Sequence, residues 1–372
     1  MSDFSFDLLD VIGRLVHSDD LSEFSNCNVW LYGNIQNSDF IKKAVDKDII
    51  RCIINENFNK ALGIAAKGGH LELCKYIVSL GATNFNKALN CAAEGGQTKV
   101  CIYMIEQGAF SYNWALYFAA KYGHIKLCEY IVSIGITTHH DYNNGLYGAA
   151  CGGYLQICEY LVAVGATNIN KALCGASRKG YLDICKYLVS IGASITNLPF
   201  QSAASGGYIE ICEYFVSLHT LSEFDINNSI YWAAYHGHLD ICKYFISFGI
   251  ATNFNDALIG AAENGHLEVC KYLVSLEAND FNRSLISAAK NEHLNVCKYF
   301  VSLGADNFND ALKEAVKSSN LELCKYFVSL GAINFASAII VNREYWGYNS
   351  ATKNRSVTMY LKEQVRIYEL NN

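Results

Sequence analysis

The chain has 372 residues, a formal net charge of −6, and acidic and basic residues that are interleaved along the sequence. This charge pattern offers no broad basic face, so we do not expect a nucleic acid as partner. No run of about 18 apolar residues occurs, so we expect no membrane-spanning helix. Fifteen cysteines, and an N-terminus without a signal-peptide pattern, favour a reducing compartment, either the cytoplasm or the nucleus.

Residues 1–37 are predicted to form an N-terminal helical segment. From Phe6 the sequence reads F-D-L-L-D-V-I-G-R-L-V-H-S-D-D-L, and Cys27 and Trp30 follow. This segment resembles an F-box, the module that binds the adaptor subunit of cullin-based ubiquitin ligases, although the usual leading Leu-Pro is absent. The resemblance implies that an adaptor docks on five apolar side chains, Leu8, Leu9, Ile12, Leu15 and Leu21. The alternative interpretation is an amphipathic helix that caps one end of a repeat array.

Residues 57–332 consist of ten copies of one unit, spaced about 27 residues apart. Such self-similarity predicts stacked units that share one continuous core. Every copy contains [L/I]-x-[L/I/V]-C-x-Y, and only Thr98 departs from its first position. Equivalent residues of stacked helices lie ~8–10 Å apart, too far for disulfides, so the cysteines are expected to be small buried apolar residues. They are Cys74, Cys101, Cys128, Cys158, Cys185, Cys212, Cys242, Cys270, Cys297 and Cys324.

The first copy, Asn57–Thr83, shows how one unit is expected to fold. The pattern A-L-x-x-A-A after Asn59 predicts a short helix, and Asn59 is placed to cap its N-terminus. Gly68-Gly69 is expected to end that helix, and the apolar spacing in residues 71–80 predicts a second helix. The unit is therefore a helix–turn–helix with a short connection. Leucine-rich repeats can have a similar period, but their L-x-x-L-x-L-x-x-N strand does not occur here.

The second half of the unit reads A-A-x-x-G-H-L-E-x-C-K-Y-[L/I]-V-S-L-x-A at Ala65–Ala82 and Ala261–Ala278. It resembles the second half of an ankyrin repeat, which implies an all-α ankyrin-type solenoid that binds a partner protein. Two departures stand out: N-x-A-L replaces T-P-L-H, and the period is shorter than the usual ~33 residues, leaving little or no room for a β-hairpin. The Asn-, Tyr- and Ile-rich style resembles ankyrin-repeat proteins of giant DNA viruses, which implies the host cytoplasm.

The ends and three insertions depart from the regular unit. Residues 38–56 are predicted to be a degenerate capping repeat, and residues 333–372 a degenerate repeat followed by a capping helix. The period grows by three residues at 139–143 and around 219–225, and by one at Ile250. Insertions in a repeat array are expected to form loops. Within the first insertion, His139-His140-Asp141 is interpreted as a solvated loop rather than part of a metal site, because no further ligands follow at suitable spacing.

An asparagine lies fifteen residues before each repeat cysteine, and it serves as a reference point for the first helix. Positions two, three, six and seven after it are mostly small or apolar, whereas positions one, four, five and eight vary and share one helical face. That variable face carries aromatic residues, the usual anchors of interfaces. The predicted partner-binding residues are Trp114, Tyr117, Phe118, Tyr147, Tyr231, Trp232 and Tyr235. The alternative is that these side chains belong to the core.

No catalytic pattern is present: the chain contains no glycine-rich phosphate loop, no H-E-x-x-H and no C-x-x-C. Histidines recur in the turn between the two helices, which indicates a structural position rather than a general base; they are His70, His124, His238, His266 and His293. We therefore predict a monomeric, non-enzymatic scaffold that binds a protein, without metal or cofactor. The alternative function is a substrate adaptor of a ubiquitin ligase that docks through residues 1–37.

Overall fold

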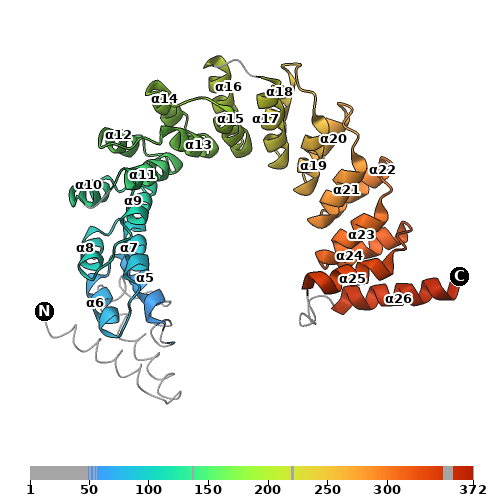
Figure 1. The fold of residues 1–372 in the computed structure, drawn as a ribbon, viewed down its shortest axis with the longest axis horizontal. Coiled ribbons are helices and arrows are strands. Elements are labelled where there is room, and N and C mark those ends of the chain that lie inside the picture. The colour runs from blue at the N-terminus through green and yellow to red at the C-terminus, as the bar shows by residue number, and fades with distance from the viewer. Residues whose placement is uncertain are drawn as a thin grey trace, which may run out of the picture. The chain divides into compact units, whose positions relative to one another are not determined.

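The computed structural model describes residues 57–135, 138–218, 222–346 and 355–371, together with Ile49, Cys52 and Asn55. This described part contains 22 α-helices, α5 to α26, and no strand (Figure 1). Consecutive helices pair as helix–turn–helix units, with the first pair formed by α5 and α6. The predicted all-α solenoid of short repeats is therefore confirmed.

The chain divides into two compact units. Unit 1 is Met1–Ala176 with Asp183–Ala193, and unit 2 is Ser177–Leu182 with Ser194–Asn372. The helices up to the boundary are α5 (Phe58–Gly68), α6 (Leu71–Ser79), α7 (Phe85–Glu94), α8 (Thr98–Glu106), α9 (Tyr112–Lys121), α10 (Ile125–Ser133), α11 (His139–Gly152), α12 (Leu155–Ala163), α13 (Ile169–Lys179) and α14 (Leu182–Ser190).

The remaining helices lie in unit 2. They are α15 (Asn197–Gly206), α16 (Ile209–Leu218), α17 (Glu223–Tyr235), α18 (Leu239–Ile246), α19 (Phe254–Glu263), α20 (Leu267–Val274), α21 (Phe281–Lys290), α22 (Leu294–Ser302), α23 (Phe308–Lys317), α24 (Leu321–Ser329), α25 (Phe335–Trp346) and α26 (Arg355–Asn371). In each unit the odd-numbered first helices pack against one another, and each even-numbered second helix packs on its own first helix (Figure 1).

The core of each unit follows the recurring sequence positions. In α5, the residues two, three, six and seven positions after Asn59 are fully buried: Ala61, Leu62, Ala65 and Ala66. All ten repeat cysteines are buried as predicted. Burial raises the pKa of the Cys74 thiol to about 12, because the thiolate would lose its hydration. These thiols therefore act as small apolar groups rather than as nucleophiles.

The predicted role of the recurring asparagine is wrong. Asn57 caps α5, because its side chain accepts the backbone N–H of Lys60, and Asn59 lies inside the helix. The Asn59 Oδ1 instead accepts the backbone N–H groups of Thr83 and Asn84, at 2.9 and 2.8 Å. These two amides belong to the connection that starts the next repeat. The asparagine therefore joins neighbouring repeats rather than capping its own helix.

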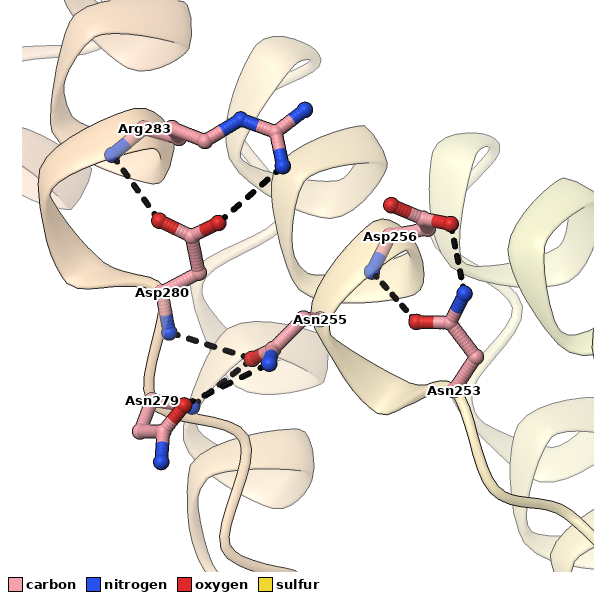
Figure 2. Close-up of polar contacts among 6 residues, drawn as sticks. All are labelled: Asn253, Asn255, Asp256, Asn279, Asp280 and Arg283. Carbon is pink, nitrogen blue, oxygen red and sulfur yellow. Dashed lines mark hydrogen bonds and ion pairs between the residues drawn. The ribbon is translucent and has the colours of Figure 1, made fainter.

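The same bridge recurs in both units, and Figure 2 shows it at Asn255. Its Oδ1 accepts the backbone N–H groups of Asn279 and Asp280, at 2.8 and 3.0 Å, while Asp280 itself caps α21 (Figure 2). We call the residues that make this contact the bridging asparagines: Asn59, Asn86, Asn143, Asn227, Asn255, Asn282 and Asn309. Each supplies an acceptor to two amides that precede a helix and lack a partner within it.

The two longer insertions extend helices instead of forming loops, which corrects the prediction. His139, His140 and Asp141 form the first turn of α11, and the Asp141 carboxylate accepts the backbone N–H and hydroxyl of Thr138. In α17 the second insertion makes the same capping arrangement with Ser222 as its N-cap. A side-chain cap lowers the free energy of an added helical turn, because it accepts hydrogen bonds from amides at the new N-terminus. The inserted residues can therefore extend the helix instead of forming a loop.

Candidate functional site

In unit 1, four of the predicted partner-binding residues form one cluster of rings. Trp114, Tyr117 and Phe118 come from α9, and their ring centroids lie 5.2–6.2 Å apart. Tyr147 of α11 stacks on Tyr117, with a centroid distance of 6.3 Å. Trp114 is 53% exposed, whereas the other three residues are half-buried. The cluster therefore presents an aromatic surface that is partly open to solvent.

Glycines on the next first helix make room for these rings. A Cβ added to Gly175 in α13 would lie 2.9 Å from the ring of Tyr147. At Gly148 in α11, a Cβ would lie 3.1 Å from the ring of Tyr117 and 2.5 Å from its carbonyl oxygen. Each tyrosine thus lies against the backbone of the following repeat. This packing restricts the rings before any partner arrives.

Two lysines border the same rings. The Lys171 ammonium of α13 lies 4.9 Å from the centroid of the Tyr147 ring, and the Lys121 ammonium lies 5.6 Å from those of Tyr117 and Tyr122. At such distances a cation is attracted by the negative face of a ring. We call this surface the aromatic–lysine face; it consists of Trp114, Tyr117, Phe118, Lys121, Tyr147 and Lys171.

The other predicted residues form a separate cluster in unit 2. Tyr231, Trp232 and Tyr235 all come from α17, with ring centroids 5.3–6.0 Å apart. Each is half-buried, and the imidazole of His236 stacks on Trp232 at 6.2 Å. As in unit 1, a ring faces a glycine of the next first helix, since a Cβ on Gly260 would lie 3.1 Å from Tyr231. Burial raises the pKa of the Tyr231 hydroxyl.

Turn histidines lie next to this second cluster, and they have a structural role as predicted. The Nε2 of His238 lies 3.2 Å from the carbonyl oxygen of Ser205, one repeat earlier. Burial lowers the pKa of His266, and the hydrogen bond to the Tyr235 backbone opposes that shift. Burial and the nearby His238 lower the pKa of His236. Burial therefore favours the neutral forms of His236 and His266.

The structure thus brings the seven predicted residues together as two groups, one in each unit, and none of the seven is fully buried. Lys121, Lys171 and His236, which contact the rings, are absent from the sequence-based prediction. The glycines five residues after the recurring asparagine are also absent from that prediction. The sequence does indicate them, because each occurs one repeat after a tyrosine of the cluster. The predicted adaptor-docking residues lie outside the described residues, as do the rest of residues 1–37.

Metal clusters and membrane-spanning helices are absent from the part of the chain that the structure describes. No group of three or more His, Cys, Asp or Glu side chains in this part could hold a metal ion. Among the described helices, none combines the length and apolar character needed to cross a membrane. The described side chains that stand out as a site are therefore the two aromatic clusters and their neighbours.

Paired helices, repeated core positions and a variable outer surface define a helical-repeat protein. The family model for ankyrin repeats, in its three-copy form, matches residues 62–142, 116–199, 200–284 and 258–338. The chain therefore belongs to the ankyrin-repeat family, whose members generally bind proteins and are generally not enzymes. No curated protein matches the chain. Among solved structures, the ankyrin repeat domain of human ASB11 is similar over 43% of this chain and 84% of its own, with 21% identity and a TM-score of 0.35.

Proposed function

We propose that the chain is a non-enzymatic scaffold that binds a protein partner through the aromatic–lysine face of unit 1. The observation that supports this most is the exposure of Trp114, a residue that remains 53% accessible within a cluster of three other rings. Tryptophan and tyrosine at the centre of an interface often contribute ~2 kcal/mol or more each. The giant-virus resemblance and the reducing compartment remain predictions that this proposal does not need.

The mechanism relies on rings that are already in place. Tyr117 and Tyr147 pack on the glycine-containing face of the next helix, and the Lys171 ammonium lies 4.9 Å from the centroid of the Tyr147 ring. Binding therefore orders few new side chains, each of which would otherwise cost ~0.5–1.5 kcal/mol. In this account the partner inserts an apolar side chain beside Trp114, where water is displaced from the exposed indole.

The unit 2 cluster supplies a second surface for a partner in the same proposal. Tyr231, Trp232 and Tyr235 are all half-buried, so they offer less open ring area than Trp114 does. We therefore expect their removal to weaken binding less than removal of Trp114. Their greater burial also means that truncation costs more folding stability.

Partner capture and thermal melting of the same variants test the proposal. The full-length chain is used to capture proteins from its native cell, and the captured protein is then titrated against purified variants. Trp114→Ala should weaken binding about tenfold or more while leaving the melting temperature nearly unchanged. Phe110→Ala is the matched control, because Phe110 is 73% exposed, lies in unit 1 and is outside the aromatic–lysine face. Equal binding by wild type and Trp114→Ala would rule out this face.

A second function, ubiquitin-ligase substrate adaptor, is proposed on the sequence of residues 1–37 alone. The L-L-x-x-I-x-x-L pattern that starts at Leu8 is its support. A pull-down with the purified ligase adaptor subunit tests it, using the full chain and a variant with Leu8, Ile12 and Leu15 changed to Asp. Retention that is lost in the variant supports the adaptor function. Failure of the full chain to retain the adaptor subunit eliminates it and leaves the scaffold proposal untouched.

A further inference from the structure

The first helices of unit 1 carry an excess of positive charge in a protein that is acidic as a whole. Up to Ala176 they contain five lysines and two acids; these are Lys60, Lys67, Lys87, Lys121 and Lys171, against Glu94 and Asp141. The second helices of the same unit carry four lysines and five acids. Positive charge is thus concentrated on the layer that also bears the aromatic–lysine face.

Most of these lysines have no carboxylate partner. Lys67 pairs with Glu94 at 2.7 Å, but Lys60, Lys87, Lys121 and Lys171 make no ion pair with any described residue. Three of the four are exposed. An exposed cation without a fixed partner can pair with an incoming anion at little desolvation cost.

The positions of these lysines place them in line with Trp114. Four residues directly follow the bridging asparagine, or the asparagine at the equivalent position, of their first helix. They are Lys60 on α5, Lys87 on α7, Trp114 on α9 and Lys171 on α13. The first helices α5, α7, α9 and α11 pack in sequence, so equivalent positions are separated by ~8–10 Å per helix, and Asn144 of α11 holds the position between those of Trp114 and Lys171. A chain in an extended conformation, which rises ~3.3 Å per residue, would meet one such position about every third residue.

From this arrangement we infer that the partner segment bound by the aromatic–lysine face is acidic: an extended peptide stretch in which Asp or Glu recurs about every third residue, with apolar residues between. This inference rests on the proposed function, because it names the class of partner for the same face. The carboxylates would pair with Lys60, Lys87 and Lys171, and an apolar residue would contact Trp114. Because the whole chain has a net charge of −6, an acidic peptide would be repelled elsewhere, so the local lysines must supply the attraction.

A fluorescence-anisotropy titration with defined probes tests the inference. The main probe is a labelled peptide with a three-residue repeat of glutamate, leucine and tyrosine. A matched peptide has glutamine in place of glutamate, and a single-stranded oligothymidylate probes nucleic-acid binding. We expect the full-length chain to bind the glutamate peptide at least about tenfold more tightly than the glutamine peptide. The difference should shrink as salt is added, because exposed charges are screened.

Two triple variants test where the attraction arises. Lys60→Glu, Lys87→Glu and Lys171→Glu together should weaken binding of the glutamate peptide about tenfold or more. The control triple is Lys75→Glu, Lys99→Glu and Lys126→Glu. It makes the same charge change on exposed residues of the second helices of unit 1. We expect it to change the affinity for the glutamate peptide less than about threefold. Thermal melts of both triples confirm that each remains folded.

Several results would overturn the inference. One is an equal loss of affinity for the glutamate peptide in the two triple variants, and another is equal binding of the two peptides. The others are tighter binding of the oligonucleotide than of the glutamate peptide, and no binding of the glutamate peptide up to about 1 mM. Titrations with Trp114→Ala distinguish a wrong peptide class from a wrong binding face. If both peptides bind equally and Trp114→Ala abolishes binding, the acidic class is wrong but the protein-binding face stands. If Trp114→Ala changes neither titration nor capture of the native partner, the face itself is wrong.

Discussion

Units 1 and 2 are built from the same repeat, yet their first helices present different chemistry. In unit 1 the rings lie beside Lys121 and Lys171, which form no ion pair with a described residue, whereas in unit 2 they lie beside His236. Five of the first helices in unit 2, α15, α17, α19, α21 and α23, carry four basic and six acidic residues, and three of the bases form ion pairs. Recurring positions thus build one scaffold, and the variable positions give each unit its own surface.

The largest predicted effect concerns the glycines under the two tyrosines. Gly148→Ala in unit 1 should lower the free energy of unfolding by about 1–3 kcal/mol, because its Cβ would lie 2.5 Å from the Tyr117 carbonyl oxygen, a backbone atom. With Gly260→Ala in unit 2, the added Cβ would lie 3.1 Å from the Tyr231 ring, which can move, and at an ordinary contact distance of 3.6 Å from the Tyr235 Cβ, while alanine favours the helix by ~0.5–1 kcal/mol. Urea unfolding of both variants measures the contrast; an equal loss in both would show that the two units pack alike.

The bridging asparagines should contribute similarly in both units. Asn143→Ala and Asn255→Ala each remove an acceptor that serves two backbone amides, at 2.7 and 2.8 Å and at 2.8 and 3.0 Å. We expect each change to cost about 1–2 kcal/mol, since water can replace part of the lost bonding at these exposed sites. Hydrogen exchange resolved by helix should show faster exchange in the altered repeat and its following neighbour. Uniformly faster exchange in both units would contradict nearest-neighbour coupling.

Acidification should weaken unit 2 through His236 and His266. Burial lowers the folded-state pKa of both imidazoles below the usual 6.5, so above that pH both states are neutral and the stabilising contribution is complete. As the pH falls below about 6.5 the unfolded chain binds protons first, and the free energy of unfolding decreases. The facing groups His238, His293 and Arg178 reinforce the shift, because their positive charges disfavour another cation nearby.

Hydrogen exchange at about pH 7.5 and about pH 5.5 measures this effect, after correction for the intrinsic exchange rate. The matched variant is His266→Gln, because Gln97 fills the same turn position in unit 1 and lies against Gly69, as His266 lies against Gly237. His266→Gln should reduce the acid-induced loss in α19 and α20. An acid-induced loss of the same size in the variant would assign the effect to other groups.

The smallest predicted effect is a stabilisation confined to unit 2. Glu277 has a φ of 70°, a left-handed conformation, seven residues after its repeat cysteine, where glycine takes this conformation in the other described repeats, as at Gly304. Glu277→Gly should raise the free energy of unfolding by about 0.5–1 kcal/mol, because strain of ~1–2 kcal/mol is removed while backbone entropy is added to the unfolded chain. Gly304→Ala, at a φ of 96°, should have the opposite sign. Thermal melts decide, and a destabilised Glu277→Gly would show that the glutamate makes a compensating contact.

The sequence was sufficient for the helical pairs and the buried cysteines, because each follows from a periodic pattern. It was insufficient for Asn59, because an N-cap and a bridge between repeats can both be made by an asparagine side chain. In N-F-N, Asn57 is the cap and Asn59, two positions later, is the bridge. The insertion at His139 was misread as a loop because its cap depends on Asp141 reaching back to Thr138. Lys171 and Tyr147 come from different repeats, so their contact requires the packing of α11 and α13.

Hydroxyl-radical footprinting of the full chain, alone and with its captured partner, tests the central claim most directly. It reports the solvent access of individual aromatic side chains, and the half-buried Tyr130 and Tyr160 on the second helices of unit 1 serve as internal references. The account predicts slower oxidation of Trp114, Tyr117 and Tyr147 in the complex, with Tyr130 and Tyr160 unchanged. Unchanged oxidation of Trp114 together with protection of Tyr130 and Tyr160 would contradict it and place the partner on the second helices.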